Sequence, residues 1–188
     1  MKETWERDMA QASSTSVICP GCGAALPPID GPTHRYIGAS APCWAIHSAL
    51  VNAGEPPMMP APHLDLIVDA YAAQHPGIHS PQSIQSVAVH LLALYSVFVQ
   101  GTDPANAVHV RARAVRGSIR SRRDRFTWLE PPNLHGGMTV AQIAAAPTPV
   151  ERTELVKVYV EEVWARWAAH YAETVAAWYA EFVVPDRL

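Results

Sequence analysis

Cys19-Pro-Gly-Cys22-Gly supplies two of the three cysteines in this 188-residue chain, and Cys43 is the third. Two cysteines separated by two residues form a tight knuckle that aims both sulfurs at one point, and zinc favours such thiolate pairs. Gly21 and Gly23 allow the left-handed backbone angles that a turn of this kind often requires. The stretch therefore predicts one metal ion bound by Cys19, Cys22 and Cys43, with the fold arranged around it.

Two other interpretations of the cysteines stay open. A CxxC pair can form a redox couple or a disulfide, but such a pair usually opens a helix after a strand, and no βαβ pattern precedes this one. The alternative is three unrelated buried thiols. The segment 18–42 is rich in Pro, Gly and Ala and has too few large apolar residues for a core of its own, which favours a metal that holds it together.

The fourth ligand is expected to be a histidine, because no second CxxC completes an all-cysteine site. The chain has nine histidines, and the nearest to the cysteines are His34, His47, His63 and His75. His47 follows Cys43 by four residues, so on a helix both would share a face. His63 and His75 are separated by about 120° around a helix and need not serve the same site.

A longer pattern joins these residues. The order CxxCG, Cys-Trp, HLxxxxxxYxxQHPG and Ser-Pro-Gln-Ser resembles an uncharacterised bacterial family, DUF5946, over about residues 18–100. The matching residues are Cys19, Cys22, Cys43, His63, Tyr71, Gln74, His75 and Pro76. The resemblance implies no activity. It implies that the cysteines and the segment from His63 to His75 form one site, so the predicted metal ligands are Cys19, Cys22, Cys43, His63 and His75.

Composition indicates a compact globular chain, with 49% apolar and 16% charged residues. The length fits a single domain, 1–188. A net charge of −3 gives no general attraction to nucleic acid. No signal peptide is visible, and the longest apolar run, Ile84–Val99, is too short to span a bilayer. The odd, low cysteine count suggests a reducing cytoplasm.

The remaining pattern predicts an all-α fold, in which a helical bundle over 43–188 follows an irregular metal-binding lobe over 1–42. Ser80-Pro81, Asp103-Pro104 and Thr148-Pro149 are helix starts, because a capping side chain precedes proline at the first turn. Helices are expected at 43–53, 63–75, 81–100, from 104 onward, at 139–145 and at 149–183. No β-strand pattern is evident.

The segment 84–99 is apolar nearly all round and should lie in the middle of the bundle. His90 within it is then either a core histidine with one hydrogen-bond partner or a ligand or catalytic residue. His170 lies at the edge of an aromatic stripe on the last helix and is a candidate neighbour of His90. Asp65 and Asp69 are candidate carboxylates that would orient a histidine.

Two further stretches have polar residues in unusual numbers. The segment Asp30–Tyr36 is interpreted as a binding loop or as a structural wrap. The segment Arg111–Arg125 contains seven arginines, which fit a solvated face, an anion site or a nucleic-acid contact. Phe126 and Trp128 are the nearby candidates for stacking on bases.

Three functions follow from these patterns. The first is a zinc-binding protein with a structural metal and a ligand or partner site on its helices, because three thiolates make zinc a poor Lewis acid. The second is a metal-dependent enzyme, in which His63, His75 or His90 acts on a metal-bound water. The third is a nucleic-acid or anion-binding module that uses Arg111–Arg125. The sequence names no substrate.

Overall fold

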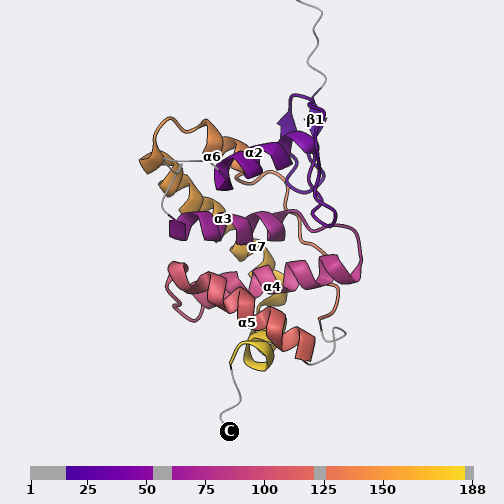
Figure 1. Ribbon diagram of the computed structural model, residues 1–188, viewed down its shortest axis with the longest axis vertical. Helices are drawn as coiled ribbons and strands as arrows, with labels where there is room; N and C mark the ends of the chain where they lie inside the picture. Colours follow the sequence, from indigo (N-terminus) through magenta and orange to yellow (C-terminus); the bar gives the residue numbers. More distant parts are fainter. Residues whose placement is uncertain (1–15, 53–60, 121–125, 185–188) are drawn as a thin grey trace, which may run out of the picture.

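The computed structural model describes residues 16–52, 61–120 and 126–184, and six α-helices dominate them (Figure 1). This confirms the all-α prediction. The first part of the expected N-terminal lobe, most of the proline-rich bridge before residue 61 and the arginines of 121–125 lie outside the described residues. None of the helices in the described ranges is long and apolar enough to cross a membrane.

Each predicted helix is present. The helices are α2 (Ala41–Val51), α3 (Ala61–Gln74), α4 (Pro81–Phe98), α5 (Ala107–Arg120), α6 (Val140–Ala145) and α7 (Pro149–Phe182). A short 3₁₀ turn, η1 (Pro104–Asn106), precedes α5. The predicted caps explain these starts, since the Ser80 hydroxyl accepts from the Ser83 N–H at 3.2 Å and Thr148 forms a capping box with Glu151.

The N-terminal lobe contains a small hairpin that the sequence did not predict. Strand β1 (Val17–Ile18) pairs antiparallel with β2 (Ala25–Leu26), so the knuckle of Cys19 and Cys22 forms the hairpin loop. Strands of two residues show no alternation of apolar and polar side chains, so the sequence pattern could not predict them.

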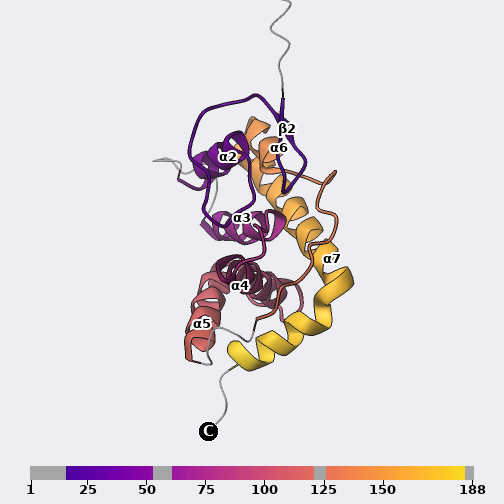
Figure 2. The same cartoon turned by 90° about the vertical axis from the view of Figure 1, so that its right-hand side faces the viewer.

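Helix α4 is the centre of the bundle, as its apolar sequence predicts. It packs against α3, α5 and α7, and Leu91, Leu92 and Leu94 are fully buried. Figures 1 and 2 show α3, α4 and α5 stacked in succession, with α7 running along one side of the stack. Helix α3 packs against both α4 and α7. This packing fixes the position of the residues that follow α3.

Helix α7 anchors the end of α3 through polar contacts from its aromatic stripe. Trp167 is buried and its indole N–H donates to the Ala73 carbonyl at 3.1 Å, while the Tyr159 hydroxyl donates to the Gln74 side chain at 3.0 Å. His170 is exposed and contacts the ring of Tyr171. The described residues show no contact between His170 and His90, so the proposed approach of these two residues has no support.

Candidate metal centre

Four of the five predicted ligands meet at one point. Cys19 and Cys22 come from the hairpin loop, Cys43 from the first turn of α2, and His75 from the residue after α3. Their ligand atoms all lie within 4.8 Å of one another. All four side chains are buried, with at most 1% of their surface exposed. Three separate elements therefore converge on one closed cluster of three sulfurs and one nitrogen.

Two separations within the cluster match those of a tetrahedral metal site. The sulfurs of Cys22 and Cys43 are 3.9 Å apart, and the Cys43 sulfur lies 3.4 Å from Nε2 of His75. A tetrahedral zinc ion with its usual bond lengths separates two sulfurs by about 3.8 Å and a sulfur from a nitrogen by about 3.5 Å. All three cysteines are free and none forms a disulfide, so the disulfide interpretation is wrong.

The His75 ring is oriented by its other nitrogen. Nδ1 donates to the Tyr71 carbonyl at 2.8 Å, which leaves the lone pair of Nε2 directed at the sulfurs. Histidines that bind metals are usually held in this way, because a hydrogen bond from one ring nitrogen fixes the tautomer and the ring angle. The hydroxyl of Tyr71 also donates to the Cys43 sulfur at 3.6 Å.

The electrostatics of the cluster are compatible with a bound cation. Hydrogen bonds from Cys22 and Cys43 lower the pKa of the Cys19 thiol, whereas the hydrogen bonds with Cys19 and Cys22 raise that of Cys43. Burial favours neutral His75, but the cysteine sulfurs outweigh this effect and raise its pKa to about 9. Three thiolates can coexist at this spacing only with a positive charge between them, which a divalent metal provides.

The two glycines of the knuckle have different tasks. Gly23 has a φ of +76°, the left-handed angle that the sequence predicts. Gly21 is needed for space, because a Cβ there would clash with the ring of His75 and lie 2.9 Å from the Gly38 carbonyl oxygen. The knuckle and the histidine are thus packed too closely for any side chain at Gly21.

The loop before α6 closes the knuckle from outside. Nε2 of His135 donates to the Pro20 carbonyl at 3.0 Å, and Arg166 of α7 donates to the His135 carbonyl at 2.9 Å. On the inner side, the Gln74 amide donates to the Met138 carbonyl at 2.8 Å. The sequence did not single out His135, because a loop histidine has no pattern that links it to a knuckle 115 residues away.

His63 is not a member of the cluster. It lies at the opposite end of α3 from His75, about 18 Å along the helix axis. Its side chain is half-buried, and Nδ1 has no hydrogen-bond partner among the described residues. The structure thus brings only the second of the two predicted histidines to the cysteines.

A second polar cluster joins α3, α4 and α5. Oδ1 of Asp69 accepts from Nδ1 of His90 at 2.7 Å and from Arg111 at 2.9 Å. Arg111 also forms an ion pair with Asp65 at 3.0 Å. Asp69 is fully buried, and 18% of the His90 side chain is exposed. The two candidate carboxylates, Asp65 and Asp69, therefore pair with Arg111 and His90 and are not part of the metal cluster.

A series of aromatic rings extends away from the metal cluster. It begins at His75 and continues in contact order through Tyr71, His47, Trp44, His34 and Tyr36. The closest pair is His47 and Tyr71, stacked at 3.8 Å between ring centroids. This ring series places the predicted polar segment Asp30–Tyr36 beside α2, where His34 and Tyr36 line a cavity together with His90.

The basic stretch is divided by the fold. Arg111 points inward to Asp65 and Asp69, and Phe126 is buried against Trp178 and Phe182. Phe126 is therefore not available to stack on a base, and the prediction that it could do so is wrong.

Comparisons with known proteins add one finding. The model of a family described as a family of unknown function, DUF5946, matches residues 17–168, a span that contains all four clustered ligands. No curated protein and no solved structure matches the chain.

Proposed function

The chain belongs to the DUF5946 family, and from this premise we propose that it is a zinc-binding protein in which the metal has a structural role. Cys19, Cys22, Cys43 and His75 would hold the ion. The observation that carries this proposal is the set of four buried ligand atoms within 4.8 Å of one another, two of whose separations match a zinc tetrahedron.

Zinc is the metal that this donor set favours. Soft thiolates and an imidazole in a tetrahedron are typical of zinc, whereas the oxygen-rich, octahedral sites of magnesium or calcium need different ligands. A closed set of three cysteines and one histidine is typical of structural sites, because catalytic zinc keeps a coordination position for water. The burial of all four ligands supports the structural role.

The proposed task of the ion is to fasten the hairpin to the bundle. The hairpin has only two residues per strand, and such a hairpin is marginal by itself in water. The ion would tie it to α2 and to the end of α3, so that lobe and bundle form one domain. The helices would then be free to present a ligand site.

The other two functions are less well supported. A catalytic metal would need an open position with a base beside it, whereas His90 is bound to Asp69 and lies outside the ligand cluster. A nucleic-acid interface would need free arginines and exposed stacking rings, whereas Arg111 is paired and Phe126 is buried.

A matched pair of histidine variants tests the proposal. The purified full chain should contain one zinc ion per molecule by mass spectrometry, and its X-ray absorption spectrum should fit three sulfurs at about 2.3 Å and one nitrogen at about 2.0 Å. His75→Gln should release the zinc, and His63→Gln should retain it. Equal retention by the two variants, or a chain that folds without metal, would refute the structural zinc site.

A further inference from the structure

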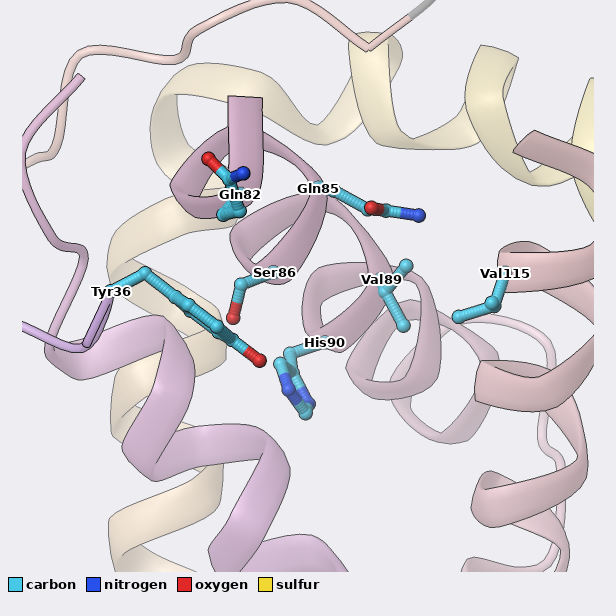
Figure 3. A pocket seen from close by; sticks show the side chains of 7 residues that line it. All are labelled: Tyr36, Gln82, Gln85, Ser86, Val89, His90 and Val115. Atoms are coloured by element: carbon cyan, nitrogen blue, oxygen red, sulfur yellow. The ribbon is translucent and has the colours of Figure 1, made fainter. Parts of the chain in front are cut away.

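A cavity beside the ring series has a complete set of features for binding a small molecule. It consists of two hollows that share Tyr36, Ser86 and His90 as lining residues, with volumes of about 130 Å³ and about 270 Å³. Figure 3 shows the hydroxyls of Tyr36 and Ser86 and the ring of His90 directed toward the same space. Apolar walls with a few convergent polar groups are typical of ligand sites.

His90 presents a hydrogen-bond acceptor to this cavity. A carboxylate only accepts, so Nδ1 of His90 carries the proton that it donates to Asp69. In the neutral ring Nε2 then has a free lone pair. Arg111 holds Asp69 from the other side, so the carboxylate and the ring are both fixed. The acceptor is therefore oriented before any ligand arrives.

Other polar atoms around the cavity lack partners. Both ring nitrogens of His47 are buried and have no hydrogen-bond partner among the described residues. Because only 6% of the surface of His47 is exposed, water cannot readily replace that partner. Nδ1 of His34 is in the same situation. An unpartnered buried donor or acceptor is costly, so a native structure rarely leaves several in one place without something to bind them.

The walls define the size and charge of the ligand. The smaller hollow is close in volume to a cavity of about 150 Å³, which holds a benzene ring. Half of its ten lining residues are aromatic or imidazole rings from the ring series. No Asp, Glu, Lys or Arg is among them. The site thus fits an uncharged single ring and not a strongly charged molecule.

The cavity lining does not form a metal cluster of this kind. Among the described residues, the only group of three or more metal-ligating atoms that could hold one ion is the cysteine cluster with His75. His34, His47 and His90 form no such group.

We propose that this cavity binds a small neutral ring compound of the phenol class, whose hydroxyl donates a hydrogen bond to Nε2 of His90. The ring lies against the aromatic walls, and His47 and Tyr36 supply further polar contacts. This inference is separate from the zinc site, since none of the four metal ligands lines the cavity.

Two probes of equal shape test the proposal. Binding of 4-fluorophenol and fluorobenzene to the metal-loaded full chain is measured by ¹⁹F NMR. We expect saturable binding of 4-fluorophenol, with fluorobenzene at least about tenfold weaker, because only the phenol supplies the hydrogen bond. His90→Phe keeps a ring but removes the acceptor, so it should weaken 4-fluorophenol about tenfold relative to fluorobenzene. The control His79→Phe, at an exposed histidine that does not line the cavity, should change neither.

A second measurement needs no variant. In ¹⁵N-histidine-labelled protein, 4-fluorophenol should shift the Nε2 resonance of His90, and fluorobenzene should not. Absence of 4-fluorophenol binding, equal affinity for the two probes, or an unmoved Nε2 signal at saturation would each overturn the proposal. Zinc content, measured in the same samples, separates these outcomes from failure of the metal site.

Discussion

The metal cluster and the cavity around His90 both adjoin the ring series, and they differ in how many of their polar groups have partners. In the cluster, the four ligand atoms all lie within 4.8 Å of one another. In the cavity, His90 lines the open space, and neither ring nitrogen of His47 has a hydrogen-bond partner among the described residues.

This difference separates two roles, a metal site and a ligand site, that the histidines in the sequence do not distinguish. A closed, self-complementary set of donors fits an ion that stays in place and stabilises the fold. An incomplete set with fixed orientation fits a molecule that comes and goes. The following predictions test this division, beginning with the change that should affect stability most.

Removal of one sulfur should have the largest effect. Structural zinc in small sites contributes about 10–16 kcal/mol of binding free energy, which matches or exceeds the whole stability of a typical domain. Cys22→Ser should therefore lose zinc and much of its helical circular dichroism, and a strong chelator should have the same effect on the wild type. A Cys22→Ser protein that stays fully helical would place the metal in a different role.

Loss of the buried carboxylate should be the next largest effect. Asp69→Ala leaves His90 without its charged partner and leaves Arg111 with Asp65 alone, and breaking a buried pair costs about 3–5 kcal/mol. Urea unfolding measures this loss. Asp65→Ala is the matched control, because Asp65 is 35% exposed and should cost at most about 1 kcal/mol. Zinc content should be unchanged in both variants, and loss of zinc from Asp69→Ala would join the two regions into one site.

A methyl group at the knuckle tests how tightly the metal cluster is packed. Gly21→Ala forces the added carbon against His75 and the Gly38 carbonyl, and overpacking of this kind costs about 1–3 kcal/mol. Thermal unfolding of the zinc-loaded protein measures the effect. Gly31→Ala, where nothing lies within 4 Å, is the control and should be neutral. Equal stability of the two variants would show that the knuckle has room to relax.

The pH dependence of stability should report the burial of His47 in the cavity wall. Burial, with a smaller contribution from nearby His75, lowers the pKa of His47 to about 4. In the unfolded chain His47 takes up a proton near its ordinary pKa of about 6.5. The free energy of unfolding of the wild type should therefore fall by about 1.4 kcal/mol per pH unit between pH 6.5 and pH 4.

The variant His47→Phe keeps a ring against Tyr71 and should lack this part of the slope. The difference between wild type and variant isolates His47 from the metal ligands, which also titrate. Exposed His109→Phe should follow the wild type. Parallel curves for wild type and His47→Phe would mean that His47 is solvated and the cavity is already wet.

The helices and the cysteine site could be predicted because their causes are local. Ser80-Pro81 and Thr148-Pro149 mark helix starts within a few residues, and Cys19 and Cys22 are fixed by one turn. The choice of His75 over His63 could not be made from spacing, since it depends on which end of α3 meets the hairpin. That end is set by contacts from α7, where Trp167 reaches the last turn of α3.

The pairing of Asp69 with His90 was beyond the sequence for a similar reason. The residues lie on different helices, 21 positions apart, and only the packing of α3 on α4 brings them together. Each was visible as a candidate, because a charged or ionisable group in an apolar helix needs a partner. The identity of that partner is a property of the packed bundle.

The position of Trp44 has a practical consequence. Its indole contacts His34 at 4.9 Å on the cavity side and His47 at 5.3 Å on the side of Tyr71. Imidazoles quench indole emission according to their protonation and contact, so the fluorescence of Trp44, isolated by difference against Trp44→Phe, becomes an intrinsic optical reporter. One native fluorophore then reads out, without any label, the filling of the cavity.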